Sequence, residues 1–157
     1  MSSIQTSSTS VSDLSAVFTR LAPLSYPLVR VTAGLLLMPH GAQKLFGWFG
    51  GYGLSGTGEF FATQLGMQPG WLFALAAGLV EFFGGLALVL GLLTRPAALA
   101  VAVLMGVAVV GVHLPSGFFW TSGGYEYPLM WGLLAIAIFL RGGDNLSLDR
   151  RLGLPLA

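Results

Sequence analysis

The chain has 157 residues, of which 55% are hydrophobic and only 8% charged, and its formal net charge is +1. Soluble domains carry about 25% charged residues, so this composition excludes a soluble hydrolase and predicts a membrane protein. The near-neutral charge offers no basic patch for nucleic acid. The sequence contains no cysteine, which excludes thiolate catalysis, disulfide exchange and cysteine-ligated iron–sulfur or zinc sites.

The N-terminal segment, residues 1–22, is polar and rich in serine and threonine. It lacks a basic stretch followed by an apolar one, so we predict no cleaved signal peptide. Residues 1 to about 12 are expected to be disordered. Residues 13–22 are expected to form a short interfacial helix capped by Ser12 or Asp13.

Four apolar stretches follow, and together they define a membrane domain over residues 23–141. A membrane-spanning helix needs ~20 mostly apolar residues. The candidate spans are residues 23–46, 71–93, 96–114 and 125–140, the last being the shortest at 16 residues. Pro128 predicts a non-helical start to the fourth span. We therefore expect an all-α integral membrane protein, built as a four-transmembrane-helix bundle.

The distribution of basic residues predicts the orientation of this bundle. Loops 46–70 and 115–125 hold no lysine or arginine, and only Lys44 lies at their border. The opposite flanks hold Arg20, Arg95, Arg141, Arg150 and Arg151. Basic flanks face the cytoplasm, so both termini are predicted to be cytoplasmic and the two loops to face outward.

The C-terminal tail, residues 142–157, is expected to be short and cytoplasmic. Gly142 and Gly143 would end the fourth helix. Ser147 is expected to cap a short turn that ends in Arg150 and Arg151. We assign no catalytic role to this tail.

The two outward loops mix glycine with phenylalanine, tryptophan and tyrosine. Residues 57–65 are predicted to form a short amphipathic helix, with Phe60, Phe61 and Leu65 against the bilayer or the bundle. Tyrosine and tryptophan favour the membrane interface, so the loops could form an aromatic belt. The alternative is that they fold inward as a lid over an outward-facing pocket.

The first span carries polar residues on one helical stripe, which consists of Arg30, Gly34, Leu37, Gly41 and Lys44. Pro39 predicts a kink in this helix. Ionisable groups inside a membrane are costly unless they are paired or hydrated. Because Arg30 and Glu81 have similar estimated depths, we predict a structural ion pair between them that joins the first two spans.

A second polar layer is expected at the outer ends of the spans. It consists of His40, Lys44, His113 and Glu126, and Glu59 of the first outward loop could join it. An apolar pocket with a few polar groups is the general form of a ligand site. A quinone head group suits such a site, because histidine and lysine can donate to its oxygens and a histidine or glutamate can carry a proton.

Each residue of this layer also has a structural interpretation. Lys44 could extend to the interface, His113 could bond a loop carbonyl, and His40 could bond the carbonyl that Pro39 leaves free. Two histidines with Glu126 could hold a metal, but no spacing fixes a ligand set, so no metal site is expected. The sequence has no motif for haem or flavin, and none for an iron–sulfur cluster.

Four motifs in chain order carry a family resemblance: HGAQKLFG, VEFFGGLALVLGLLTRPAA, a histidine followed by GGYEYPLMW, and GGDNLSLD. Over about residues 26–150 the chain resembles the DoxX family of small four-helix bacterial membrane proteins. The resemblance implies a helical bundle in the bacterial cytoplasmic (inner) membrane and an association with redox complexes, among them quinone-linked thiosulfate and terminal-oxidase complexes. The family's pattern positions fall on Arg30, His40, Gly41, Lys44, Glu81, Gly84, Gly85, Gly91, Arg95, His113, Gly124, Glu126, Tyr127, Ser147 and Asp149.

Three functions stay open at this point. The chain could be a quinone-binding subunit that acts with a partner oxidoreductase or respiratory complex. It could be a non-enzymatic structural or assembly subunit of a larger membrane complex. It could also be a component for small-solute transport, which would require a homo-oligomer because four spans are few for a pathway. Subunit functions are favoured over stand-alone catalysis, and the sequence does not decide whether the chain is an enzyme.

Overall fold

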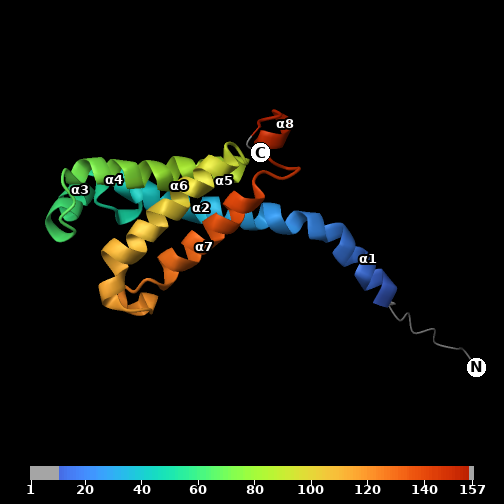
Figure 1. Ribbon diagram of the computed structural model, residues 1–157, viewed down its shortest axis with the longest axis horizontal. Helices are drawn as coiled ribbons and strands as arrows, with labels where there is room; N and C mark the ends of the chain where they lie inside the picture. The colour runs from blue at the N-terminus through green and yellow to red at the C-terminus, as the bar shows by residue number, and fades with distance from the viewer. Residues whose placement is uncertain (1–10, 156–157) are drawn as a thin grey trace, which may run out of the picture.

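The computed structural model describes residues 11–155, and within this range it contains helices and loops but no strand. The chain forms four long helical runs (Figure 1). They are α2 (Ser25–Phe46); α4, η3 and α5 (Gly70–Leu79, Val80–Gly84 and Gly85–Leu90); α6 and η4 (Thr94–Ala108 and Val109–His113); and α7 (Glu126–Arg141). The shorter elements are α1 (Val11–Leu21), η1 (Ala22–Leu24), η2 (Trp48–Gly50), α3 (Gly53–Gln64), η5 (Leu114–Ser116), η6 (Trp120–Ser122) and α8 (Leu148–Arg151).

Three helical stretches are long and apolar enough to cross a membrane: Asp13–Phe46, Gly70–Leu90 and Thr94–Ser116. They correspond to the first three predicted spans. The fourth, α7, has 16 residues and packs along α6. Its predicted non-helical start is wrong, because α7 begins at Glu126 and includes Pro128. A proline in the first helical turn costs little, since the amide that it lacks has no intrahelical partner there.

The long runs alternate in direction, so the bundle has two distinct ends. We call the end that carries Arg95, Arg141, Arg150 and Arg151 the basic end, and the end that carries residues 47–69 and 114–125 the loop end. The α6–η4 and α4–α5 runs lie close at the basic end and spread apart toward the loop end (Figure 1).

The helix α1 leaves the bundle at the basic end and extends away from it (Figure 1). Leu14, Val17, Phe18 and Leu21 are all exposed, and their spacing places them on one face of the helix. This is the amphipathic pattern of the predicted interfacial helix. The helix includes Ser12 and Asp13, so the expectation that one of them caps it is wrong. The predicted disorder of residues 1 to about 12 falls mainly outside the described residues.

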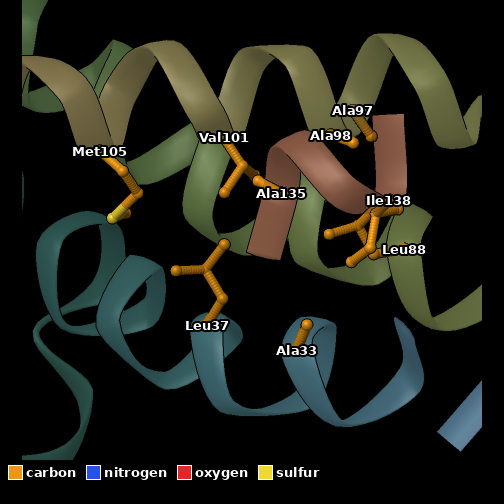
Figure 2. Close-up of a cluster of buried hydrophobic side chains, with 9 residues drawn as sticks. All are labelled: Ala33, Leu37, Leu88, Ala97, Ala98, Val101, Met105, Ala135 and Ile138. Atoms are coloured by element: carbon orange, nitrogen blue, oxygen red, sulfur yellow. The ribbon is translucent and has the colours of Figure 1, made fainter. Parts of the chain in front are cut away.

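The buried core is built from small and aliphatic side chains of α2, α5, α6 and α7 (Figure 2). Its members are Ala33, Leu37, Leu88, Ala97, Ala98, Val101, Met105, Ala135 and Ile138. Large apolar side chains cover the outside of the bundle, among them Phe83, Val103, Leu133 and Leu140. Such a surface matches the hydrocarbon core of a bilayer rather than water.

The helix α2 packs against the second run with the two backbones in contact. Gly34 lies against Gly85, and a Cβ atom on Gly41 would lie 2.8 Å from the carbonyl oxygen of Gly78. Close approach through small residues is a main source of helix association in lipid. The stripe predicted on α2 is confirmed for Arg30, Gly34, Leu37 and Gly41, which are all buried.

The C-terminal tail folds back onto the basic end. Asp149 caps the start of α6, because its carboxylate accepts the backbone amides of Leu93 at 2.6 Å and Thr94 at 2.8 Å. Its own amide donates to the carbonyl of Gly91 at 2.8 Å. Ser147 caps α8 by accepting the Arg150 amide at 3.2 Å, as the sequence predicted.

Gly91 allows this close fit. It has a φ of 63°, which glycine adopts without strain. A Cβ atom there would lie 2.5 Å from the Ser147 side chain.

Candidate ligand site

A cavity of about 730 Å³ lies at the loop end, between the α3–α4 pair on one side and α6–η4 on the other. Most of its lining is apolar. Phe60, Phe61 and Leu65 line it from α3 and the residue after it, and Val103 and Val107 line it from α6. The predicted helix in the first outward loop is therefore confirmed as α3, which begins four residues earlier, at Gly53.

The polar groups in this lining are Lys44, Glu81 and His113. The Lys44 Nζ atom lies 2.7 Å from Glu81 Oε2. The Glu81 residue is only 7% exposed, and the Lys44 side chain is partly exposed. A short contact between a buried carboxylate and an ammonium group compensates both charges. The cavity wall therefore contains a preformed ion pair rather than an unpaired charge.

Glu81 and His113 each lie in a π-helical turn. Glu81 is in η3 and His113 ends η4. A π-helical turn adds one residue to an α-helix, which rotates the face that follows by about 100°. Such turns are frequent at functional sites. Here both turns present their polar residue to the same cavity.

His113 bonds a loop carbonyl, as one of its two interpretations predicted. Its Nδ1 atom lies 2.7 Å from the carbonyl oxygen of Gly123. This bond fixes the ring against the loop at residues 114–125. His113 is also among the residues that line the cavity.

The other members of the predicted polar layer lie outside the cavity lining. His40 is exposed on α2, and Glu59 is exposed on α3. Glu126 accepts the backbone amide of Trp120 at 3.2 Å and thereby ties the second loop together. The structure thus brings Lys44 and His113 to one cavity and places His40, Glu59 and Glu126 elsewhere. Whether any of these residues binds a ligand stays a prediction.

The two loops of the loop end differ in their relation to the cavity. The first loop lines it through α3 and Met67, which agrees with a lid. The second loop packs on itself: the rings of Trp120 and Tyr127 stack with centroids 5.3 Å apart, and Phe118 meets Tyr125 edge to face. Its aromatic residues do not line the cavity. The helix α2 continues through Pro39 to Phe46, so the kink stays a prediction.

The predicted Arg30–Glu81 ion pair is wrong. Arg30 is 1% exposed, and its Nε atom lies 3.1 Å from Asp144 Oδ2. Its Nη1 atom donates to the carbonyl of Leu88 and, at 3.1 Å, to that of Val89. Glu81 lies seven residues before Leu88 on the same run, about 10 Å along the axis. Glu81 is therefore at the level of Lys44 rather than of Arg30.

Asp144 is the residue that the sequence interpretation missed. It follows α7 in the polar GGDNLSLD segment, and the carboxylates of that segment were the signal that could have identified it. Tyr26 also holds this end, because its hydroxyl donates to the carbonyl of Gly142 at 2.5 Å and the Arg141 guanidinium lies 4.4 Å from its ring centroid. Among the described residues, no three histidine or carboxylate side chains are grouped so that they could hold a metal ion.

Comparison with known proteins identifies the family. The family model named DoxX matches residues 26–114. The chain belongs to the DoxX family. The Bacillus subtilis protein named "Putative oxidoreductase CatD" is 30% identical over 78% of this chain and 82% of its own length. An uncharacterised membrane protein of Mycobacterium tuberculosis is 33% identical over 83% of this chain and 82% of its own. No solved structure matches this DoxX protein.

Proposed function

We propose that this protein is a redox-associated subunit of the bacterial cytoplasmic membrane that binds a quinone-class ligand in its loop-end cavity. The observation that carries the proposal is the apolar cavity of about 730 Å³ with the partly buried Lys44–Glu81 pair and His113 in its wall. Cavities that bind small molecules have about this volume and this mixture of groups. The relative that is named an oxidoreductase supports a redox setting.

The lining suits an aromatic head group with an apolar tail. The rings of Phe60, Phe61 and Phe73 supply apolar faces, and the Lys44 ammonium group supplies a hydrogen-bond donor. Val103 lines the cavity and is 60% exposed, so the cavity is open rather than enclosed. In the membrane arrangement proposed here, a membrane-dissolved ligand would enter through this opening.

The proposed arrangement has α7 as a fourth span, both termini in the cytoplasm and the loop end facing outward. The basic end carries Arg95, Arg141, Arg150 and Arg151, and basic flanks are retained on the cytoplasmic side. The cavity then lies in the outer half of the bilayer. A partner oxidoreductase or respiratory complex would exchange electrons with the bound ligand.

Ligand binding can be tested with protein reconstituted in lipid nanodiscs. Decylubiquinone is offered in its oxidised and reduced forms, and saturable binding is measured by equilibrium dialysis. Val103→Trp fills the cavity, whereas Val110→Trp adds the same bulk to an exposed valine outside its lining. We expect wild type and Val110→Trp to bind alike, and Val103→Trp to bind at least tenfold more weakly. The proposal is overturned if neither the oxidised nor the reduced form binds saturably, or if the two variants bind equally well.

A structural or assembly role is the second candidate function. The observation that favours it is the basic end, where buried Arg30 and Asp149 hold helices and tail together and lie outside the lining of the loop-end cavity. Isolation of the protein from native membranes tests this role. A large complex that assembles equally well with wild type and Val103→Trp, together with unchanged quinone-dependent respiration, would favour it over ligand binding.

A further inference from the structure

The bond from His113 to the second loop fixes which nitrogen of the ring carries a proton. The carbonyl oxygen of Gly123 lies 2.7 Å from Nδ1 and can only accept a hydrogen bond. Nδ1 must therefore donate, and it carries the proton of the neutral ring. The other nitrogen, Nε2, is then an acceptor.

The other two polar groups of the cavity largely satisfy each other. The Lys44 ammonium group already donates to Glu81 at 2.7 Å, and the Glu81 carboxylate has acceptor atoms only. The residues that line the cavity thus carry one shared donor, the Lys44 ammonium, and two kinds of acceptor, His113 Nε2 and the Glu81 carboxylate. An oxidised quinone has only carbonyl acceptors, whereas a dihydroxybenzene has hydroxyl groups that donate as well as accept.

We infer that the cavity selects the reduced, hydroxyl-bearing form of a quinone-class ligand, and that His113 is the residue that determines this preference. The inference rests on the proposed function of the same cavity. A hydroxyl group of the ligand donates to His113 Nε2, and a ligand oxygen accepts from Lys44. A dione in the same place leaves His113 Nε2 without a partner, and an unpaired polar atom in an apolar site weakens binding.

The test compares duroquinol with duroquinone, which has nearly the same shape, and with the dimethyl ether of duroquinol, which is larger by two methyl groups. Their full ring substitution prevents addition reactions with lysine. Affinities are measured without oxygen in nanodiscs at pH 8. We expect duroquinol to bind at least tenfold more tightly than duroquinone. The dimethyl ether, which has lost both donors, should bind no better than duroquinone.

Two matched variants assign the preference to one residue. His113→Leu removes the cavity acceptor that is not already bonded to Lys44, and His40→Leu makes the same change at an exposed histidine outside the lining. The ratio of duroquinol to duroquinone affinity is read within each variant, so a partial loss of folded protein does not alter it. We expect the ratio to fall to about one in His113→Leu and to stay at the wild-type value in His40→Leu.

The outcomes separate this inference from the proposed function. If none of the three ligands binds saturably, acyl chains alone fill the cavity and both proposals fail. If duroquinone binds as tightly as duroquinol, or if His113→Leu keeps the preference, the inference fails while the ligand site stands.

Discussion

The two ends of the bundle use buried polar groups in different ways. At the basic end, Arg30 is shared between a carboxylate and two backbone carbonyls, and Asp149 accepts two amides at the start of α6. At the loop end, Lys44 and Glu81 meet in the wall of a cavity, and His113 bonds a loop. Polar groups that close contacts between elements stabilise the fold, whereas polar groups that line a cavity are available to a ligand. Substitutions at the two ends should therefore have opposite consequences.

The largest loss of stability is expected from Arg30→Met. The change leaves Asp144 and the carbonyls of Leu88 and Val89 without their partner, and breaking a buried ion pair from one side costs about 3–5 kcal/mol. The free energy of unfolding is measured by titrating SDS into dodecylmaltoside micelles. Arg151→Met, at an exposed arginine of the same end, is the control. An equal effect of the two variants would contradict the structural role of Arg30.

Asp149→Ala is expected to cost about 2–3 kcal/mol, because the amides of Leu93 and Thr94 lose the oxygen atoms that accept them. Asp149→Asn retains one amide oxygen and should cost about half as much by the same SDS titration. Folded Asp149→Asn should keep the wild-type affinity for duroquinol. A loss of affinity equal to that of Val103→Trp would mean that the two ends do not act separately.

Gly41→Ala tests the close contact between α2 and the second helical run, which lies between the two ends of the bundle. Its Cβ atom would meet the backbone of Gly78 and Phe82, and such overpacking costs about 1–3 kcal/mol. Gly106→Ala is the control, since nothing lies within 4 Å of a Cβ atom there, and it should change stability by less than about 1 kcal/mol. Because Lys44 follows Gly41 by one helical turn, Gly41→Ala should also weaken duroquinol binding. Equal stability of both variants would contradict the close helix contact.

The smallest effect on stability is expected from the double change Lys44→Met with Glu81→Leu. Replacing a buried ion pair by apolar groups of similar volume is often neutral, whereas removing one partner leaves an uncompensated charge. The double variant should therefore be more stable than Lys44→Met alone in the SDS titration. Its duroquinol affinity should nevertheless fall about tenfold. Unchanged affinity would exclude the pair from ligand binding.

Features with local causes were predictable from the sequence. The three long apolar spans, the helix in the first outward loop and the Ser147 cap follow from composition, periodicity and capping chemistry. The His113 contact with a loop carbonyl was foreseen as one of two interpretations. The buried stripe on α2 follows from helical spacing alone, because residues three and four apart share a face.

Features that depend on remote partners were not predictable. The similar estimated depths of Arg30 and Glu81 suggested that the two form an ion pair. The C-terminal tail instead places Asp144 beside Arg30. His40 was grouped with Lys44 by its estimated depth. It lies about 100° around the helix from the buried Gly41 and is exposed, so a shared depth did not bring it into the cavity. The π-helical turns at Glu81 and His113 have no mark in the sequence, and they decide which residues reach the cavity.

The most direct measurement is photoaffinity labelling with an azido-quinone in nanodiscs, followed by peptide mapping. The cavity account predicts adducts within residues 60–67 and 100–113, lost on addition of excess duroquinol and in Val103→Trp but retained in Val110→Trp. Adducts spread over the exposed surface of α7, such as Leu133 and Leu140, with no competition by duroquinol would contradict it.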